Sequence, residues 1–188
     1  AMNTGFKPVS IASDFSGNIY VGHEYTGVYS MNKQSGNLTR VHPNMNAPGN
    51  FIAPMSPNKI YYAPEGYDYL RIFQFINGEH STFMGNGNYG LVDGPALQAQ
   101  FFGIHGMAVN REGVVYFIDA FGRVLRKIEN GTVTSLAGLQ NGQGMMGFVD
   151  GSFAKARMNG AKNICFDKDG VLYIAESGNK AIRKVCLK

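Results

Sequence analysis

The sequence predicts an all-β fold, and three observations lead to this prediction. First, residues 149–185 repeat residues 92–128: 10 of the 37 positions are identical and the alignment needs no gap. Second, the 188-residue chain contains 25 glycines and is 12% aromatic, a composition typical of short strands joined by many turns. Third, two to five turn residues separate the β-rich runs, which is the spacing of hairpins. A repeat of fixed length indicates stacked copies of one supersecondary unit.

The two best-matching copies predict four strands per unit. In the last copy, apolar residues 161–166 precede the turn DKDG, the strand VLYIAE, the turn SGN and the strand AIRKV. The copy before it has the same order with GMAVN, REG, VVYFID and VLRKI, and it continues through Asn130-Gly131 into a fourth strand, TVTSLAG. Asn-Gly favours the tight turn of a hairpin. Each copy is therefore expected to form a four-stranded antiparallel sheet.

Two earlier segments follow the same pattern, with the strands IYVGHE, GVYSM and LTRV in one and IYYAP, YLRIFQF and HSTFMG in the other. Four-stranded units repeated every 41 to 57 residues are typical of the blades of a β-propeller, which bury both faces against their neighbours. A pair of stacked sandwiches is the alternative, and the constant offset with matching turns argues against it. We expect a single propeller domain over residues 1–188, with blades at approximately residues 6–45, 46–85, 86–138 and 139–188.

Composition and charge exclude several functional classes. The net charge is only +4, and no run of Lys and Arg is dense enough to follow a phosphate backbone, so no nucleic-acid partner is indicated. The longest apolar runs have the length of strands and predict no membrane-spanning segment, and no signal peptide is recognisable. Cys165 and Cys186 are expected to be free thiols, because an intervening strand would hold their Cα atoms beyond the roughly 7 Å limit for a disulfide.

The third and fourth units resemble NHL repeats, which have a Gly-rich lead, DG followed by A-x-F, a first strand, D-x-x-G and a segment similar to VYVAD-x-x-N-x-x-IRKI. Glu176 replaces the usual Asp and Asn163 replaces the usual Gly. The long lead loops are also similar to those of bacterial secreted NHL proteins, which often carry an upstream TIG domain. The resemblance implies a propeller and an extracellular or cell-surface location. The matching positions of the fourth unit are Asp150-Gly151, Ala156, Asp167, Gly170, Tyr173, Asn179 and residues 182–185.

The number of blades departs from the NHL pattern. NHL propellers usually close with six blades, whereas this chain holds four, and its last unit ends after a third strand. A fourth strand would have to come from residues 3–7. We expect the C-terminal part of a larger, six-bladed propeller, with a closed four-bladed ring as the alternative. An open arc exposes apolar blade edges and faces, and such patches drive self-association.

Strand direction predicts where ligands bind. The loop before the first strand and the loop between the second and third strands lie on the same side of every blade, here called the loop face. Loops from several blades converge there near the channel, which is where propellers generally bind ligands. The candidate ligand-binding residues of the loop face are His23, Glu24, Tyr25, Glu65, Tyr67, Tyr69, His105, Asp119, Phe121, Lys162 and Glu176.

Several candidates also have structural interpretations. Asp119 and Glu176 share a repeat-wide acidic position, and a basic residue also recurs in both units, so structural ion pairs are favoured over ligand binding. Asp93 and Asp150 suit turn capping. The glycines of the lead loops lack the G-x4-GK[ST] pattern of a phosphate cradle and are interpreted as loop.

His23 and His105 interrupt the repeat at positions expected to face the channel. Glu65 or Glu176 would complete a metal site with them, and NHL-like amidating lyases hold a metal through histidines. No short His or Cys spacing supports such a site, so we predict neither a metal nor another cofactor. No catalytic residue is predicted either, because G-x-S-x-G is absent and the serines fall in turns.

Aromatic residues are the remaining indication of a binding site. Three blades have them in the loop between the second and third strands, namely Tyr25, Tyr67, Tyr69 and Phe121. Rings suit stacking on sugars or gripping a peptide, and the alternative is that they cover blade edges. The sequence therefore favours a non-catalytic binding scaffold whose loop face recognises a glycan or a protein. A hydrolase or lyase with a channel metal and a purely structural spacer are the alternatives.

Overall fold

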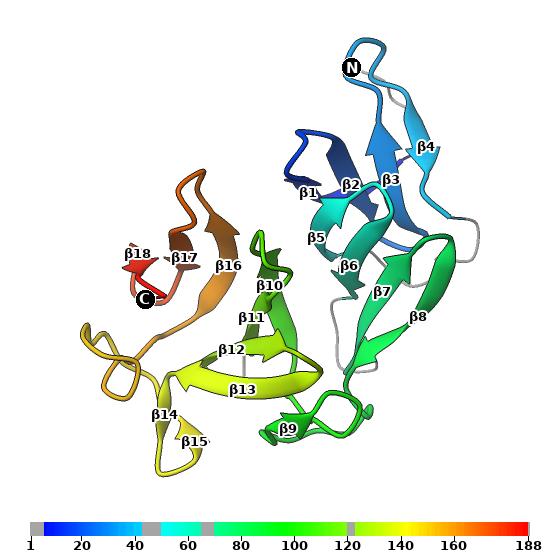
Figure 1. Ribbon diagram of the computed structural model, residues 1–188. Helices are drawn as coiled ribbons and strands as arrows, with labels where there is room; N and C mark the ends of the chain where they lie inside the picture. Colours follow the sequence, from blue (N-terminus) through cyan, green and yellow to red (C-terminus); the bar gives the residue numbers. More distant parts are fainter. Residues whose placement is uncertain (1–5, 43–49, 65–69, 120–122, 188) are drawn as a thin grey trace.

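In the computed structural model every regular element is a strand (Figure 1). The structure describes residues 6–42, 50–64, 70–119 and 123–187. These ranges contain no helix, and hence none that is long and apolar enough to cross a membrane. The prediction of an all-β fold is confirmed.

Four antiparallel sheets follow one another along the chain and are called blades 1 to 4. Blade 1 consists of β1 (Pro8–Ser13), β2 (Ile19–His23), β3 (Gly27–Met31) and β4 (Leu38–Arg40). Blade 2 consists of β5 (Phe51–Ser56), β6 (Lys59–Ala63), β7 (Ile72–Ile76) and β8 (Glu79–Met84). Blade 3 consists of β10 (Ile104–Val109), β11 (Val115–Asp119), β12 (Val124–Glu129) and β13 (Thr132–Ala137), with the short β9 (Gly94–Pro95) paired to β13. Blade 4 consists of β16 (Ala161–Phe166), β17 (Leu172–Glu176) and β18 (Ala181–Val185), and a small hairpin, β14 (Leu139–Gln140) and β15 (Gln143–Gly144), lies in the loop before it.

The first strands of the blades lie side by side: β1 packs against β5, β5 against β10, and β10 against β16. A separate apolar cluster fills each interface. Tyr20 and Ile60 belong to the cluster between blades 1 and 2, and Tyr61 and Phe117 to the one between blades 2 and 3. The third cluster joins blades 3 and 4. This arrangement is a propeller of four blades, as the sequence predicts.

The four blades form an open arc. Blade 1 and blade 4 lie at its two ends (Figure 1), and within the described residues no packing comparable to that between neighbouring blades joins β16 to β1. Over the same residues blade 4 has three strands. The structure therefore has the arc rather than the closed four-bladed ring.

The turn after the first strand has the same construction in three blades. The side-chain oxygens of Asp14, Asn110 and Asp167 each accept a hydrogen bond from the backbone amide four residues later, at 2.8 to 2.9 Å. A glycine with positive φ, between +78° and +85°, lies three residues after each of them. This left-handed conformation favours glycine, which explains the D-x-x-G spacing of the repeat.

Candidate functional site

A buried arginine joins the lead loop of blade 3 to its strands. The Arg126 side chain is fully buried and donates to Asp93 at 2.7 Å and to Asp119 at 3.3 Å. It also donates to the carbonyl oxygens of Val92 and Gln100 at 2.8 and 2.7 Å. Removing a charge from water costs several kcal/mol per ion unless it is paired, and these acceptors supply the pairing. The cluster therefore holds the lead loop against β12.

Blade 4 repeats this cluster with every partner shifted by 57 residues. Arg183 donates to Glu176 at 3.1 Å and to Asp150 at 2.6 Å. Its two carbonyl acceptors belong to Val149 and Arg157. The identical design in two blades shows that these ionic groups belong to the construction of the repeat.

The clusters determine the roles of four acidic residues. The Asp119 and Glu176 side chains are fully buried, and each also accepts a hydrogen bond from a backbone amide of its lead loop. Both are thus engaged in the structural ion pairs that the sequence favours. Asp93 and Asp150, which the sequence assigns to turn capping, are instead the second carboxylates of the same clusters.

The loop-face candidates of blade 1 form a small aromatic group. His23 is half-buried, and its Nδ1 accepts hydrogen bonds from the backbone amides of Tyr25 and Thr26 at 3.0 and 3.2 Å. Phe6 packs edge-on against the His23 ring, with 4.6 Å between centroids. Tyr25 is 57% exposed, and the Lys7 ammonium lies 5.1 Å from its centroid. Tyr25 is the ring that this part of the loop face offers to solvent.

The remaining candidates do not gather into one site within the described residues. His105 is half-buried in β10 with its ring 6.0 Å from that of Phe51, and Lys162 is exposed on β16. Glu24 forms an ion pair with Lys7. The described part of the chain contains no group of three or more His, Cys, Asp or Glu side chains placed to hold a metal ion. Four candidates lie outside the described residues: Glu65, Tyr67, Tyr69 and Phe121.

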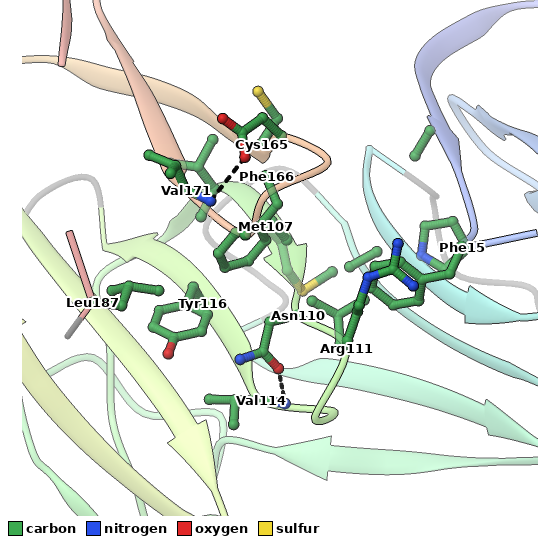
Figure 2. A pocket seen from close by; sticks show the side chains of 18 of the residues that line it. Phe15, Met107, Asn110, Arg111, Val114, Tyr116, Cys165, Phe166, Val171 and Leu187 are labelled. Atoms are coloured by element: carbon green, nitrogen blue, oxygen red, sulfur yellow. Dashed lines mark hydrogen bonds between the residues drawn. The ribbon is translucent and has the colours of Figure 1, made fainter. Parts of the chain in front are cut away.

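A cavity of about 1250 Å³ lies along the inner strands of the arc (Figure 2). All four blades line it. Blades 1, 3 and 4 contribute the later part of the first strand and the turn that follows, and blade 2 contributes residues 52–54 of β5. These turns are at the opposite end of the first strands from the loop face. The lining comprises residues 11–15, 52–54, 107–112, 163–171 and 185–187 with Val114, Tyr116 and Glu129.

Rings and charges lie next to each other on the cavity wall. The Arg111 guanidinium is 5.1 Å from the centroid of the Phe15 ring, so the turn of blade 3 contacts the turn of blade 1 (Figure 2). Tyr116 and Phe166 meet edge to face at 5.4 Å between blades 3 and 4. Cys165 and Cys186 are free, exposed and part of the lining. The cavity is therefore amphipathic, with apolar rings beside cationic and anionic groups.

The turn carboxylates add negative charge to the cavity rim. A backbone hydrogen bond from Val171 holds the pKa of Asp167 below its usual value. Burial alone would raise the pKa of Asp14, but hydrogen bonds from Asn18, Tyr20 and Ser16 outweigh burial and lower it. Both side chains are therefore ionised at neutral pH. Arg111 and Lys168 add positive charge to the lining, and Lys168 forms an ion pair with Asp169 at 2.8 Å.

Sequence reasoning missed the cavity residues. Phe15, Arg111 and Lys168 each follow the first residue of the turn motif, so they occupy one equivalent position in three blades. The sequence does distinguish this position: its residue type differs between blades, whereas the turn residues around it repeat. From the sequence, these turns have only a structural role. The arrangement of the blades in the arc shows that the three turns converge on one cavity.

Comparison with known proteins supports this architecture. No protein-family model and no curated protein matches the chain. A protein of unknown function from Bacteroides thetaiotaomicron superposes with a TM-score of 0.74 at 24% identity, over 93% of this chain and 46% of that one. An auxiliary nutrient binding protein from the same organism gives 0.70 at 21% identity, over 92% and 46%. A streptogramin B lyase gives 0.63 at 17% identity, over 99% and 54%.

This chain thus spans about half the length of each of these proteins. Identities below 25% carry information about the fold but not about activity. The NHL family and an upstream TIG domain remain predictions from the sequence. What the similarity shows is the fold, and the fold is a β-propeller.

Proposed function

We propose that this chain is a non-catalytic binding module that takes its ligand in the cavity on the inner side of the arc. The observation that carries the proposal is that Phe15, Arg111 and Lys168, at one equivalent position in three blades, all line one cavity. Variable side chains on a rigid, repeated frame are the usual construction of a binding site.

A glycan is the class of ligand that this wall favours. Aromatic rings such as Phe15 stack on the apolar faces of sugars, and charged groups such as Arg111 and Asp169 hydrogen-bond to hydroxyls. The cavity volume of about 1250 Å³ exceeds the range of about 300 to 1,000 Å³ typical of sites for small ligands. An oligosaccharide therefore fits the volume better than a single sugar.

The comparisons agree with this proposal in one respect. One of the similar structures is described as an auxiliary nutrient binding protein, and an oligosaccharide is a nutrient-type ligand. We propose an extracellular or cell-surface location, which the same similarity and the resemblance to secreted NHL proteins support.

A glycan array followed by calorimetry with the best glycan tests the proposal. Phe15→Ala and Arg111→Ala should each weaken binding by roughly 1 to 3 kcal/mol, the range for anchor residues. Tyr25→Ala, an exposed ring on the loop face, is the matched control and should leave affinity unchanged. An array without any bound glycan, or normal binding by both cavity variants, would reject the cavity as the glycan site.

Protein binding by the loop face is a second candidate, because the lead loops expose large apolar side chains. Tyr89 and Met146 occupy equivalent positions and are 52% and 59% exposed, and Phe148 is 61% exposed. Scattered exposed residues are ordinary, but clustered ones mark contact sites. In a pull-down, Met146→Ser with Phe148→Ser should reduce recovery of a partner that Phe15→Ala still recovers.

Metal-dependent hydrolase or lyase chemistry has less support. In the described residues His23 already accepts two backbone hydrogen bonds at Nδ1, and it packs in blade 1 whereas His105 lies in blade 3. Elemental analysis of the purified chain tests this alternative directly. If the array, the pull-down and the metal analysis are all negative, the structural spacer is the remaining interpretation.

A further inference from the structure

The lead loop of blade 4 exposes apolar side chains between the β14–β15 hairpin and the turn at residues 152–155. Met146, Phe148 and Val149 are 59%, 61% and 45% exposed, and together they are called the lead-loop patch. The Arg183 guanidinium lies 5.8 Å from the centroid of the Phe148 ring, so the patch adjoins the ionic cluster of blade 4. Clustered exposed apolar side chains of this kind mark contact sites.

The exposure of the patch does not come from the end of the arc. Blade 3 has a neighbour on both sides, and the equivalent residues of its lead loop, Tyr89 and Val92, are still 52% and 45% exposed. The two loops also have the same backbone pairing: the antiparallel bridge between Val149 and Arg157 has a counterpart 57 residues earlier in blade 3. Blade 3 therefore shows what the repeat itself needs in this loop.

The charge of the loop differs between the two blades. The lead loop of blade 3 contains one acid and no base over residues 88–100, whereas that of blade 4 contains one acid and two bases over residues 145–157. The two bases, Lys155 and Arg157, occupy positions at which blade 3 has glutamines. Since blade 3 forms the same loop without these bases, the fold does not require their charge.

The surroundings of the patch are also positive. Lys180 lies beside the loop, because the neighbouring Asn179 side chain donates to the Gly147 carbonyl oxygen at 2.9 Å. The acid of the loop, Asp150, is already paired with Arg183 at 2.6 Å. Within the described residues, no ion pair involves Lys180 or either base of the loop. The patch thus combines exposed apolar groups with positive charge that no described carboxylate neutralises.

We propose that the lead-loop patch binds an acidic segment of a partner protein. An apolar side chain of that segment packs against Met146 and Phe148. Its carboxylates face Lys155, Arg157 and Lys180. An apolar centre with charged groups around it is the usual anatomy of a protein interface, and complementary charge selects the partner. The inference rests on the loop-face candidate for protein binding and is independent of the glycan cavity, whose lining contains none of these residues.

A random copolymer of glutamate and tyrosine is a suitable probe, because it combines carboxylates with rings. Fluorescence anisotropy of the labelled copolymer should show binding that weakens as salt is added, since salt screens exposed charges. Polyglutamate lacks the rings and should bind about ten-fold more weakly, the loss expected for a missing apolar anchor. A copolymer of lysine and tyrosine carries the wrong charge and should bind more weakly than the glutamate copolymer.

Lys155→Gln and Arg157→Gln give blade 4 the residues that blade 3 has at these positions. Each change should weaken binding of the glutamate–tyrosine copolymer by about two- to five-fold, the range for an exposed charge pair. Lys33→Gln is the matched control, because Lys33 is exposed in the β3–β4 turn, at the opposite end of the strands from the loop face. This control and the cavity variant Phe15→Ala should both bind normally.

The apolar half of the patch has its own test. Met146→Ser with Phe148→Ser should weaken binding of the glutamate–tyrosine copolymer about ten-fold but leave the weaker binding of polyglutamate unchanged. Leu97→Ser is the control, because Leu97 is a 60% exposed apolar residue in the lead loop of blade 3, which has no base. Equal thermal unfolding midpoints of the variants and the original chain establish that all of them are folded.

Three results would overturn the proposal: no binding of the glutamate–tyrosine copolymer, equal binding of the lysine–tyrosine copolymer, or normal binding by the two glutamine variants. Preferential binding to phosphatidylserine vesicles would overturn it too. Three bases are fewer than the roughly four to eight of lipid-binding clusters, so we expect no such preference. A partner recovered in the pull-down without copolymer binding would keep the loop face as a protein-binding surface and reject only the acidic partner.

Discussion

Arg126 and Asp93 form an ion pair at 2.7 Å, although 33 residues separate them in the chain. Arg183 and Asp150 form the same pair in the next blade at 2.6 Å. The pair connects the glycine-rich lead of a blade to its third strand, and the lead then runs into the first strand. The ionic cluster therefore fixes the one long connection that hairpin geometry leaves free.

Arg126→Met should destabilise the fold by about 3 to 5 kcal/mol, the cost of leaving a buried charge without its partner. The buried carboxylate of Asp119 is the charge left behind. Chemical denaturation measures the change. Lys127→Met is the control on the same strand, because Lys127 forms only a partly exposed pair with Glu129 and should contribute about 1 kcal/mol or less. Similar losses for the two variants would contradict a structural role for the cluster.

The stability of the chain should fall as the pH decreases below about 6.5, the ordinary pKa of histidine. Burial, followed by repulsion from His42, lowers the pKa of His80 below its usual 6.5, and the His80 ring also hydrogen-bonds to Tyr62. The unfolded chain then binds the proton more readily than the folded one. The contribution is complete above pH 6.5 and is lost as the pH falls below this value.

Thermal unfolding midpoints across this pH range measure the effect, and His80→Gln should flatten the profile. Asp14 and Asp167 affect stability in a separate pH range, below their usual pKa of 3.8. Their pKa values are lowered in the folded chain, so stability is lost there as protonation weakens their turn hydrogen bonds. An unchanged slope in the His80→Gln variant would show that another group is responsible.

Gly106→Ala should be more destabilising than Gly131→Ala. Both glycines have positive φ, +78° and +73°, so both substitutions incur backbone strain of about 1 to 2 kcal/mol. At Gly106 an added Cβ would also lie 2.7 Å from Asn163 Cα, where β10 packs against β16, whereas Gly131 has no atom within 4 Å. Urea unfolding of the two variants isolates the cost of separating two inner strands. Equal losses would mean that the inner strands adjust freely.

A ligand in the cavity should protect two thiols from labelling. Cys165 and Cys186 are both exposed and both line the cavity. Without ligand both should react with a thiol reagent in the native state, and a bound glycan should slow both reactions. Arg111→Ala should reduce the protection in proportion to its lost affinity. Unchanged labelling rates at saturating glycan would place the ligand elsewhere.

Much of the architecture is predictable from local chemistry. The turn motif around Asp167 and Gly170 combines a side-chain acceptor with a residue that tolerates positive φ, and both requirements are met within four residues of chain. The recurrence of Arg126 at Arg183 similarly predicts a structural ion pair. The role of Asp93 is not predictable in this way, because its partner lies 33 residues away and local reasoning assigns it to a turn.

The binding surface is the part that local chemistry does not determine. Tyr25 stands out in the sequence as a ring in a polar loop, and the structure leaves it exposed on the loop face. Phe15 and Arg111 stand in ordinary turns, 96 residues apart, and nothing local indicates that they meet. Their contact depends on how far each blade is rotated from the last.

The sequence by itself determined the strands, the turns and their repetition in four blades, because alternation, turn residues and periodicity are properties of neighbouring positions. Only the tertiary structure decided between the open arc and the closed four-bladed ring, and only it shows that three turns converge on one cavity. The physical reason is that the angle between blades comes from the packing of whole sheets. Small differences in that packing add up over the three interfaces between blades, and no single stretch of sequence encodes their sum.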